Sequence, residues 1–169
     1  MELFEALHSR RSIRGFTDQP VENALIEKCL RAAMMAPSAG NAQPWEFVVI
    51  RDRRILERIP DLHPHASMAP HAAAAVIVCA VTDREKYAGN FPADCGAATQ
   101  NLLLALHGCG LGAVWCGVYP REERMAPIRE LLGLPDSVVP FSLVPVGWPA
   151  EEKPEPDRFE TERIHHDRW

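Results

Sequence analysis

Three arginines, Arg10, Arg11 and Arg14, lie within five residues near the start of the chain. A guanidinium group stays charged at physiological pH and presents a planar fork of donors, so it binds phosphate or carboxylate groups bidentately. Ser12 adds a hydroxyl donor in the same segment, directly after a predicted helix over residues 2–9. These residues form a candidate anion site, although a charged run after a helix is also typical of a solvated turn.

A second candidate is the segment from Pro37 to Trp45, which reads Pro-Ser-Ala-Gly-Asn-Ala-Gln-Pro-Trp. It indicates a turn that exposes backbone donors and the amides of Asn41 and Gln43 beside an aromatic ring. On its own, this pattern is more typical of a plain connection between a helix and a strand. Together with the arginines, it predicts a site for a ligand that carries a phosphate and an aromatic ring.

Other cofactor and metal motifs are absent or weak. No GxGxxG follows a strand and no GxxxxGK[ST] occurs, and the glycines of residues 108–112 follow a predicted helix, which disfavours a Rossmann enzyme. His63, His65 and His71 share one loop, so a metal hydrolase is a rival interpretation. Their spacing matches no standard ligand pattern, and we expect no metal.

The cysteines are odd in number and show no CxxC spacing, which argues against a disulfide framework and fits a reducing compartment. Cys116 lies in a segment that we place near the ligand, but a nucleophilic role would need a histidine partner that the sequence does not locate.

Composition indicates one globular domain over residues 1–169, with 47% hydrophobic and 24% charged residues. The net charge of −5 argues against a general nucleic-acid binder. No stretch approaches the ~20 apolar residues that span a bilayer, and the first residues lack the features of a signal peptide. We therefore expect a cytoplasmic protein that binds neither membrane nor nucleic acid.

Hydrophobic periodicity predicts five helices and four strands. Helices are expected over residues 2–9, 22–35, 53–59, 95–107 and 121–132, and strands over residues 45–50, 74–81, 113–116 and 138–146. Pro60 is expected to end the third helix, while Pro140 and Pro145 indicate an edge or a bulge in the last strand. Because helices and strands interleave without strict βαβ alternation, we expect an α+β fold.

The stretch from Cys95 to Pro120 contains no Asp, Glu, Lys or Arg. Its predicted helix should be buried nearly all round, and in so small a chain a subunit interface is the natural cover. Residues 150–169, by contrast, form a charged C-terminal extension without helical or strand period. Phe159 and Trp169 suggest that this extension packs on the domain or on a partner.

Four blocks, taken in order, resemble the FMN-dependent nitroreductase family of NAD(P)H oxidoreductases. They are Arg10–Arg14, Pro37–Trp45, Asp94–Pro120 with its Gly110-Leu111-Gly112, and Gly147–Trp169 with its Lys153-Pro154 and Arg158. Each block is weak alone, but their joint order is specific. The resemblance implies a nitroreductase-like α+β fold with a central, mostly antiparallel sheet flanked by helices. It also implies an intertwined homodimer with one FMN in each of two interface sites.

The resemblance assigns roles to the matching residues. Residues 10–14 match the block that binds the FMN phosphate, ribityl chain and pyrimidine edge, and residues 37–41 match a turn that reaches the flavin from the partner subunit. The main chain around Gly117 matches the segment that faces the isoalloxazine ring, and Arg158, or Arg163 in its place, completes the phosphate site. The implied cofactor-binding set, which has no catalytic side chain and no metal, is Arg10, Arg11, Ser12, Arg14, Pro37, Ser38, Asn41, Gln43, Trp115, Gly117, Val118 and Arg158.

The implied activity is hydride transfer from NADH or NADPH to flavin N5 and on to a small organic acceptor, in a ping-pong sequence. A nitroaromatic, a quinone and an enone all fit as acceptor, and the sequence separates neither these nor the two nicotinamides. The alternative is a non-catalytic flavin-binding or sensory module. The chain is short for this family, so we expect an open cleft over the flavin.

Overall fold

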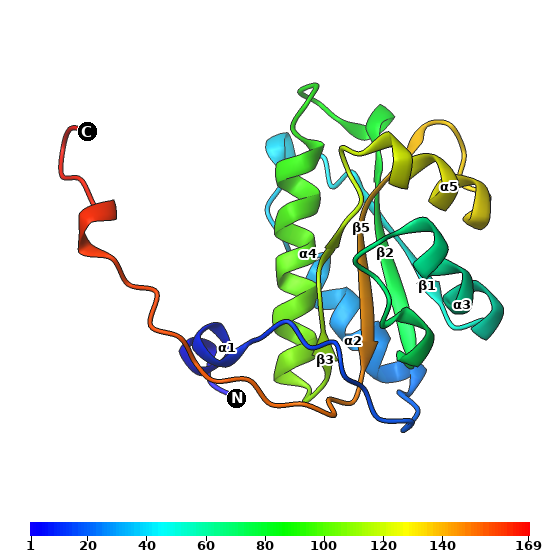
Figure 1. Ribbon diagram of the computed structural model, residues 1–169. Helices are drawn as coiled ribbons and strands as arrows, with labels where there is room; N and C mark the ends of the chain where they lie inside the picture. Colours follow the sequence, from blue (N-terminus) through cyan, green and yellow to red (C-terminus); the bar gives the residue numbers. More distant parts are fainter.

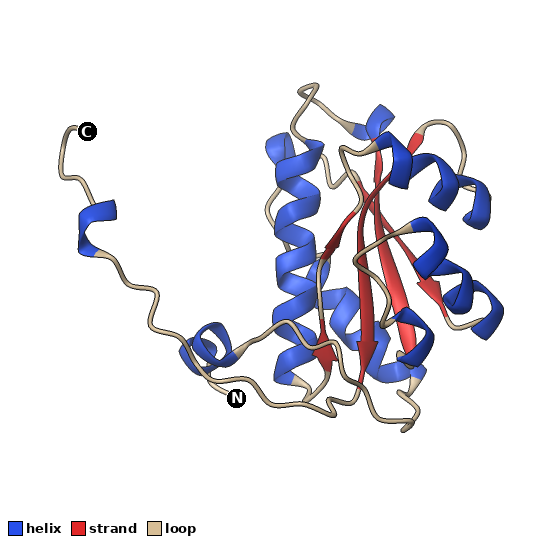
Figure 2. Ribbon diagram, in the orientation of Figure 1, coloured by secondary structure: helices blue, strands red, loops and turns tan.

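A five-stranded sheet lies between two layers of helices in the computed structural model, which describes residues 1–169 (Figures 1 and 2). The strand order is β1-β2-β5-β3, with β4 also paired to β5, and every pairing between named strands is antiparallel. The strands are β1 (Trp45–Ile50), β2 (Ala74–Val81), β3 (Gly112–Ala113), β4 (Cys116–Gly117) and β5 (Val138–Gly147). The fold is therefore the expected α+β arrangement.

Each face of the sheet has its own hydrophobic core, and the helices divide between them. Helices α2 (Asn23–Ala33) and α4 (Phe91–Gly108) cover one face, and α3 (Arg53–Leu62) and α5 (Glu122–Leu132) cover the other (Figure 1). Helix α1 (Leu3–Ser9) lies apart from the sheet, against α4. Because β2 is covered on both faces, it reads as a continuous apolar run. Short 3-10 turns occur at Ala39–Asn41, Ala69–His71, Thr82–Arg84 and Thr161–Arg163.

Of the two alternatives that the prolines of β5 indicated, an edge or a bulge, the structure has the bulge, because β5 lies between β2 and the short strands β3 and β4. The expected bulge is confirmed: Ser142 pairs with Val78 and Pro140 with Cys79, so Phe141 is the extra residue. The bulge accommodates a proline in a central strand. Its carbonyl, at Phe141, accepts the amides of Val118 and Tyr119 at 3.1 and 3.0 Å.

Other predicted boundaries also differ from the structure: α4 begins at Phe91 rather than Cys95, and α2 ends at Ala33 rather than Met35. Pro60 does not end α3, which continues to Leu62, and the amide of His63 still closes the last turn on the Ile59 carbonyl. The predicted strand 113–116 is interrupted at residues 114 and 115, which leaves β3 and β4 as two short pieces.

The long helix α4 is only partly covered by this chain. One side is buried in the core, while Gly96, Ala97, Gln100 and Leu104 stay half-buried. The expectation of burial all round is therefore not met by one chain alone. No helix of the structure is long and apolar enough to cross a membrane.

Residues 10–17 run beside β3 and the start of the C-terminal segment. The amide of Ile13 donates to the Ala113 carbonyl at 3.0 Å, and the amide of Thr17 donates to the Trp148 carbonyl at 2.9 Å. Ile13 lies so close over Gly112 that a Cβ there would be 2.7 Å from Ile13 Cγ2. Farther on, the C-terminal segment extends away from the body of the molecule (Figure 1).

Candidate functional site

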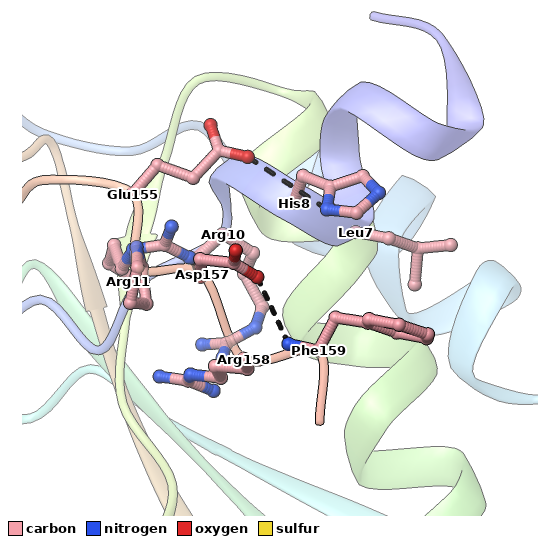
Figure 3. Close-up of a pocket in the computed structure, with 9 residues that line it drawn as sticks. Leu7, His8, Arg10, Arg11, Glu155, Asp157, Arg158 and Phe159 are labelled. Carbon is pink, nitrogen blue, oxygen red and sulfur yellow. Dashed lines mark hydrogen bonds and ion pairs between the residues drawn. The ribbon is translucent and has the colours of Figure 1, made fainter. Parts of the chain in front are cut away.

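Arg10, Arg11 and Arg158 line a cavity of about 620 Å³ between the end of α1 and the C-terminal segment (Figure 3). We call these three residues the arginine cluster. Two acids share the wall: Glu155 lies 3.8 Å from His8 Nδ1, and Asp157 accepts the amide of Phe159 at 3.0 Å. No carboxylate oxygen lies within 4 Å of the three guanidinium groups, so the cluster has no internal counter-ion.

The electrostatics of the arginine cluster suit an anion. Burial, together with the charges of Arg11 and Arg158, lowers the pKa of the Arg10 guanidinium. Arg11 donates from Nε to the Pro154 carbonyl at 2.8 Å and from Nη1 to the Arg10 carbonyl at 2.6 Å, but its buried Nη2 has no partner. A phosphate would satisfy this donor and offset the mutual repulsion of the three cations.

Ser12 and Arg14 lie farther along the same segment and line no part of this cavity. Ser12 forms a bridge to Ala113, and its carbonyl accepts Lys153 Nζ at 2.6 Å. Arg14 is exposed; burial raises the pKa of the Cys116 thiol in β4, and the charge of Arg14 acts to lower it. Of the three arginines in residues 10–14, only Arg10 and Arg11 therefore line the cavity.

The segment around Gly117 offers open space beside the main chain. A Cβ built on Gly117 would meet no atom within 4 Å. Trp115, 37% exposed, packs its ring 5.8 Å from that of Phe141, whereas Val118 is fully buried and its amide already donates to Phe141. The position next to the Gly117 Cα is therefore open to a ligand.

Cys116, beside Gly117, is a poor nucleophile. Burial raises the pKa of its thiol to about 11, although the charges of Arg14 and Arg124 act in the opposite direction. The thiol contacts the carbonyl of His65 at 3.4 Å. A thiol in this state stays protonated near neutral pH.

The turn over residues 37–43 is fixed on α4. The amide of Ala39 donates to Asp94 Oδ1 at 2.9 Å, and the amide of Gln43 donates to Ser38 Oγ at 3.0 Å. Asn41 and Gln43 adopt positive φ angles of 54° and 49°, and both side chains are exposed, as is Pro37. Asp94, which is 5% exposed, keeps its second carboxylate oxygen buried without a partner.

The turn and the arginine cluster lie at opposite ends of α4. The turn is bonded to Asp94 near the start of the helix. Near the end of the helix, burial is the main cause that lowers the pKa of His107, and the charges of Arg10 and Arg11 lower it further. At 1.5 Å per residue, the helix rises about 20 Å between Asp94 and His107. One chain therefore does not bring the two predicted parts of the site together.

Sequence reasoning missed several residues that support these parts. The sequence assigned Asp94 no role of its own, because its hydrogen bond joins it to Ala39, a residue far away in the sequence. His63 was considered only as a metal ligand, but its ring contacts the Gly117 carbonyl at 2.9 Å, and Arg124 Nη1 donates to the same carbonyl at 2.7 Å. The His-Pro-His sequence was the only signal for His63, and it indicated no partner.

Comparison with known proteins gives a consistent result. The model of the nitroreductase family matches residues 7–82 and 66–148. A protein of Methanothermobacter thermautotrophicus, provisionally named NADH dehydrogenase/NAD(P)H nitroreductase, is 48% identical over 100% of this chain and 88% of its own length.

Solved structures share the fold over almost the full length. A provisionally named NADH dehydrogenase/NAD(P)H nitroreductase from Parabacteroides distasonis superposes with a TM-score of 0.94 at 38% identity, covering 98% of both chains. A nitroreductase from Desulfovibrio desulfuricans, also provisionally named and solved in complex with FMN, has a TM-score of 0.88 at 28% identity. That likeness covers 100% of this chain and 98% of the other.

Proposed function

This chain belongs to the nitroreductase family of NAD(P)H oxidoreductases, and on that premise we propose that it binds FMN and reduces small organic acceptors. When bound, FMN would accept hydride at N5 from NADH or NADPH and pass it to a nitroaromatic, a quinone or an enone, in a ping-pong sequence. The arginine cluster carries this proposal, because it gathers three cations and a buried unpartnered donor with no counter-ion. One such site suits the single phosphate of FMN.

In this proposal, two parts of the chain hold the two ends of the flavin mononucleotide. Arg10, Arg11 and Arg158 would bind the phosphate, and Arg14 would lie toward the pyrimidine edge of the ring. Gly117 would leave room for the isoalloxazine because no side chain occupies that space. We propose no side chain as an acid or a base, because the cofactor would supply the redox chemistry and the protein would bind and orient it.

We further propose a homodimer, with residues 1–169 as one domain and residues 150–169 lying against the second copy. The turn of residues 37–43 is bonded near one end of α4 and the arginine cluster of the same chain acts near the other end, about 20 Å along the helix, so a second copy would have to supply the turn. Exposed apolar side chains support this arrangement: Phe4 is 74% exposed, and Phe159 on the extended C-terminal segment is 72% exposed. Surfaces of this kind are typical of obligate interfaces.

The dimer is tested by light scattering on the flavin-loaded protein. The expected mass is twice that of the 18.8 kDa chain. A stable monomer that still holds flavin would contradict the shared site.

The activity is tested by anaerobic titration of the purified yellow protein with NADH and with NADPH. At least one nicotinamide should bleach the flavin absorbance, and an added quinone or nitroaromatic should restore it. Tight FMN binding without reduction by either nicotinamide would instead support the flavin-binding or sensory module.

A further inference from the structure

We infer that His63 and Arg124 are positioning residues that fix the main chain at Gly117, and through it the position of the flavin ring. This inference rests on the proposed function. It starts from one carbonyl: the oxygen of Gly117 accepts a hydrogen bond from His63 Nε2 at 2.9 Å and another from Arg124 Nη1 at 2.7 Å. The two donors come from different elements, His63 directly after α3 and Arg124 in α5.

The hydrogen bonds of His63 fix both its tautomer and its orientation. Its Nδ1 accepts the backbone amide of His65 at 3.2 Å, so the proton of the neutral ring is on Nε2 and is donated to Gly117. The side chain is 1% exposed. Burial is the main cause that lowers the pKa of His63, and the charges of Arg124 and His65 act in the same direction. The ring is therefore neutral near pH 7 and has both nitrogens paired.

The peptide unit after Gly117 is held at both ends. Its carbonyl accepts the two donors, and its N–H, which belongs to Val118, donates to the Phe141 carbonyl at 3.1 Å. Because a peptide unit is planar, these contacts define its orientation completely. β4 itself is only two residues long, so the strand ladder contributes little to holding this segment.

The fixed peptide adjoins an open position. His63 and Arg124 belong to the layer of helices α3 and α5, whereas a Cβ on Gly117 would meet nothing within 4 Å. A ring placed against Gly117 would take its position from this main chain. Displacement of a reacting centre by 1 Å costs up to about a hundredfold in rate, so these donors would act on reaction geometry more than on FMN affinity.

The test compares variants that remove the hydrogen-bond donor at residue 63 or 124 with variants that retain a donor at the same position. His63→Ala and Arg124→Ala remove the donors, whereas His63→Gln and Arg124→Lys retain an N–H at each place. His65→Ala is the matched control for the histidine because its side chain is exposed, and Arg121→Ala is the control for the arginine because it is exposed and ion-paired to Glu123 at 3.7 Å. Each protein is examined for FMN affinity, for the visible circular dichroism of bound FMN, and for the rate of reduction at saturating FMN.

We expect His63→Ala and Arg124→Ala to change the visible dichroism and to slow reduction roughly tenfold to a hundredfold. FMN affinity should change by less than about threefold, since the arginine cluster supplies most of it. His63→Gln should recover most of the rate. If His63→Ala does not fold, Arg124→Ala carries the comparison, because Arg124 is half-buried and its loss leaves no cavity in the core.

Two kinds of failure are distinguishable. If the wild-type protein binds no FMN, the proposed function fails, and this inference fails with it. If the wild type binds FMN and both alanine variants match the controls in dichroism and rate, the proposed function stands, and His63 and Arg124 have only a structural role.

Discussion

The arginine cluster and the Gly117 segment would hold the two ends of the same ligand by opposite means. The arginine cluster consists of long charged side chains on a surface cavity, with no counter-ion and one unpartnered donor. The Gly117 segment consists of uncharged main chain, and its carbonyl is fixed by hydrogen bonds from the buried His63 and from Arg124. Charge acts over several ångströms and tolerates movement, whereas hydride transfer needs a position fixed within a fraction of an ångström. The difference indicates that affinity and reaction geometry depend on separate parts of the molecule.

The largest effect should follow loss of charge in the arginine cluster. Arg10→Ala or Arg158→Ala removes one charge-assisted hydrogen bond to the phosphate, worth about 1.5–3 kcal/mol, so FMN affinity should fall about tenfold to a hundredfold. Fluorescence quenching of FMN measures this, and reduction at saturating FMN should be little changed.

Arg163→Ala is the control for that experiment. Arg163 donates twice to Glu160, at 2.6 and 2.8 Å, and does not line the cavity. Its loss should leave FMN affinity unchanged. A larger effect at Arg163 than at Arg158 would show that the wrong basic residue has been assigned to the phosphate.

Gly112→Ala should displace the segment that carries Arg10 and Arg11 and leave the Gly117 segment unchanged. The added Cβ would lie 2.7 Å from Ile13 Cγ2 and 2.9 Å from Ile13 Cβ, so residues 10–17 would have to shift. Overpacking of this kind costs about 1–3 kcal/mol of folding free energy, to be measured by denaturant unfolding. FMN affinity should fall as well. Gly108→Ala is the control, because a Cβ there meets nothing within 4 Å.

Gly117→Ala should have the converse effect, on reaction geometry alone. The methyl group meets no atom of this chain within 4 Å, so stability should be unchanged within about 0.5 kcal/mol. It would occupy the space assigned to the ring, and reduction by the nicotinamide should slow about tenfold. Stopped-flow reduction measures the rate, and an unaltered rate would place the ring elsewhere.

The smallest expected effect is the pH dependence of stability that His63 contributes. Burial lowers the folded pKa of His63 below its ordinary value, so the unfolded chain binds a proton more readily. The stabilisation is present above pH ~6.5 and declines as the pH falls below it. His63→Gln should flatten this decline, with the remainder due to His107, whose pKa is lowered too. Unfolding free energies at pH 7.5 and 5.5 provide the comparison, and equal slopes in both proteins would contradict a neutral, buried His63.

The sequence predicted those parts of the fold and site that depend on local patterns. The bounds of β1 and β2 follow from apolar runs between turn residues. The three arginines of residues 10–14 indicate an anion site by their spacing alone, without knowledge of their contacts. The prolines of β5 left an edge and a bulge open, and only the strand pairing decides between them: the bulge at Phe141 accommodates Pro140 in a central strand.

The missed parts of the site depend on contacts between distant residues. His63 lies 54 residues from Gly117, and no local pattern links the two. The turn of residues 37–43 was assigned to a partner subunit by resemblance alone, and the separation along α4 supplies a physical reason for that assignment. Arg158 likewise came from the resemblance, because a lone basic residue in a charged C-terminal segment has no distinguishing pattern.

The identity of the bound cofactor tests the central claim most directly. The protein is purified, the chromophore is released by denaturation, and the flavin is identified and counted per chain. The account predicts FMN, one per chain, because the three arginines line one cavity, which suits a single phosphate, and the sequence has no GxGxxG fingerprint for a dinucleotide. Release of FAD, or absence of any flavin combined with no tight FMN binding on titration, would contradict it.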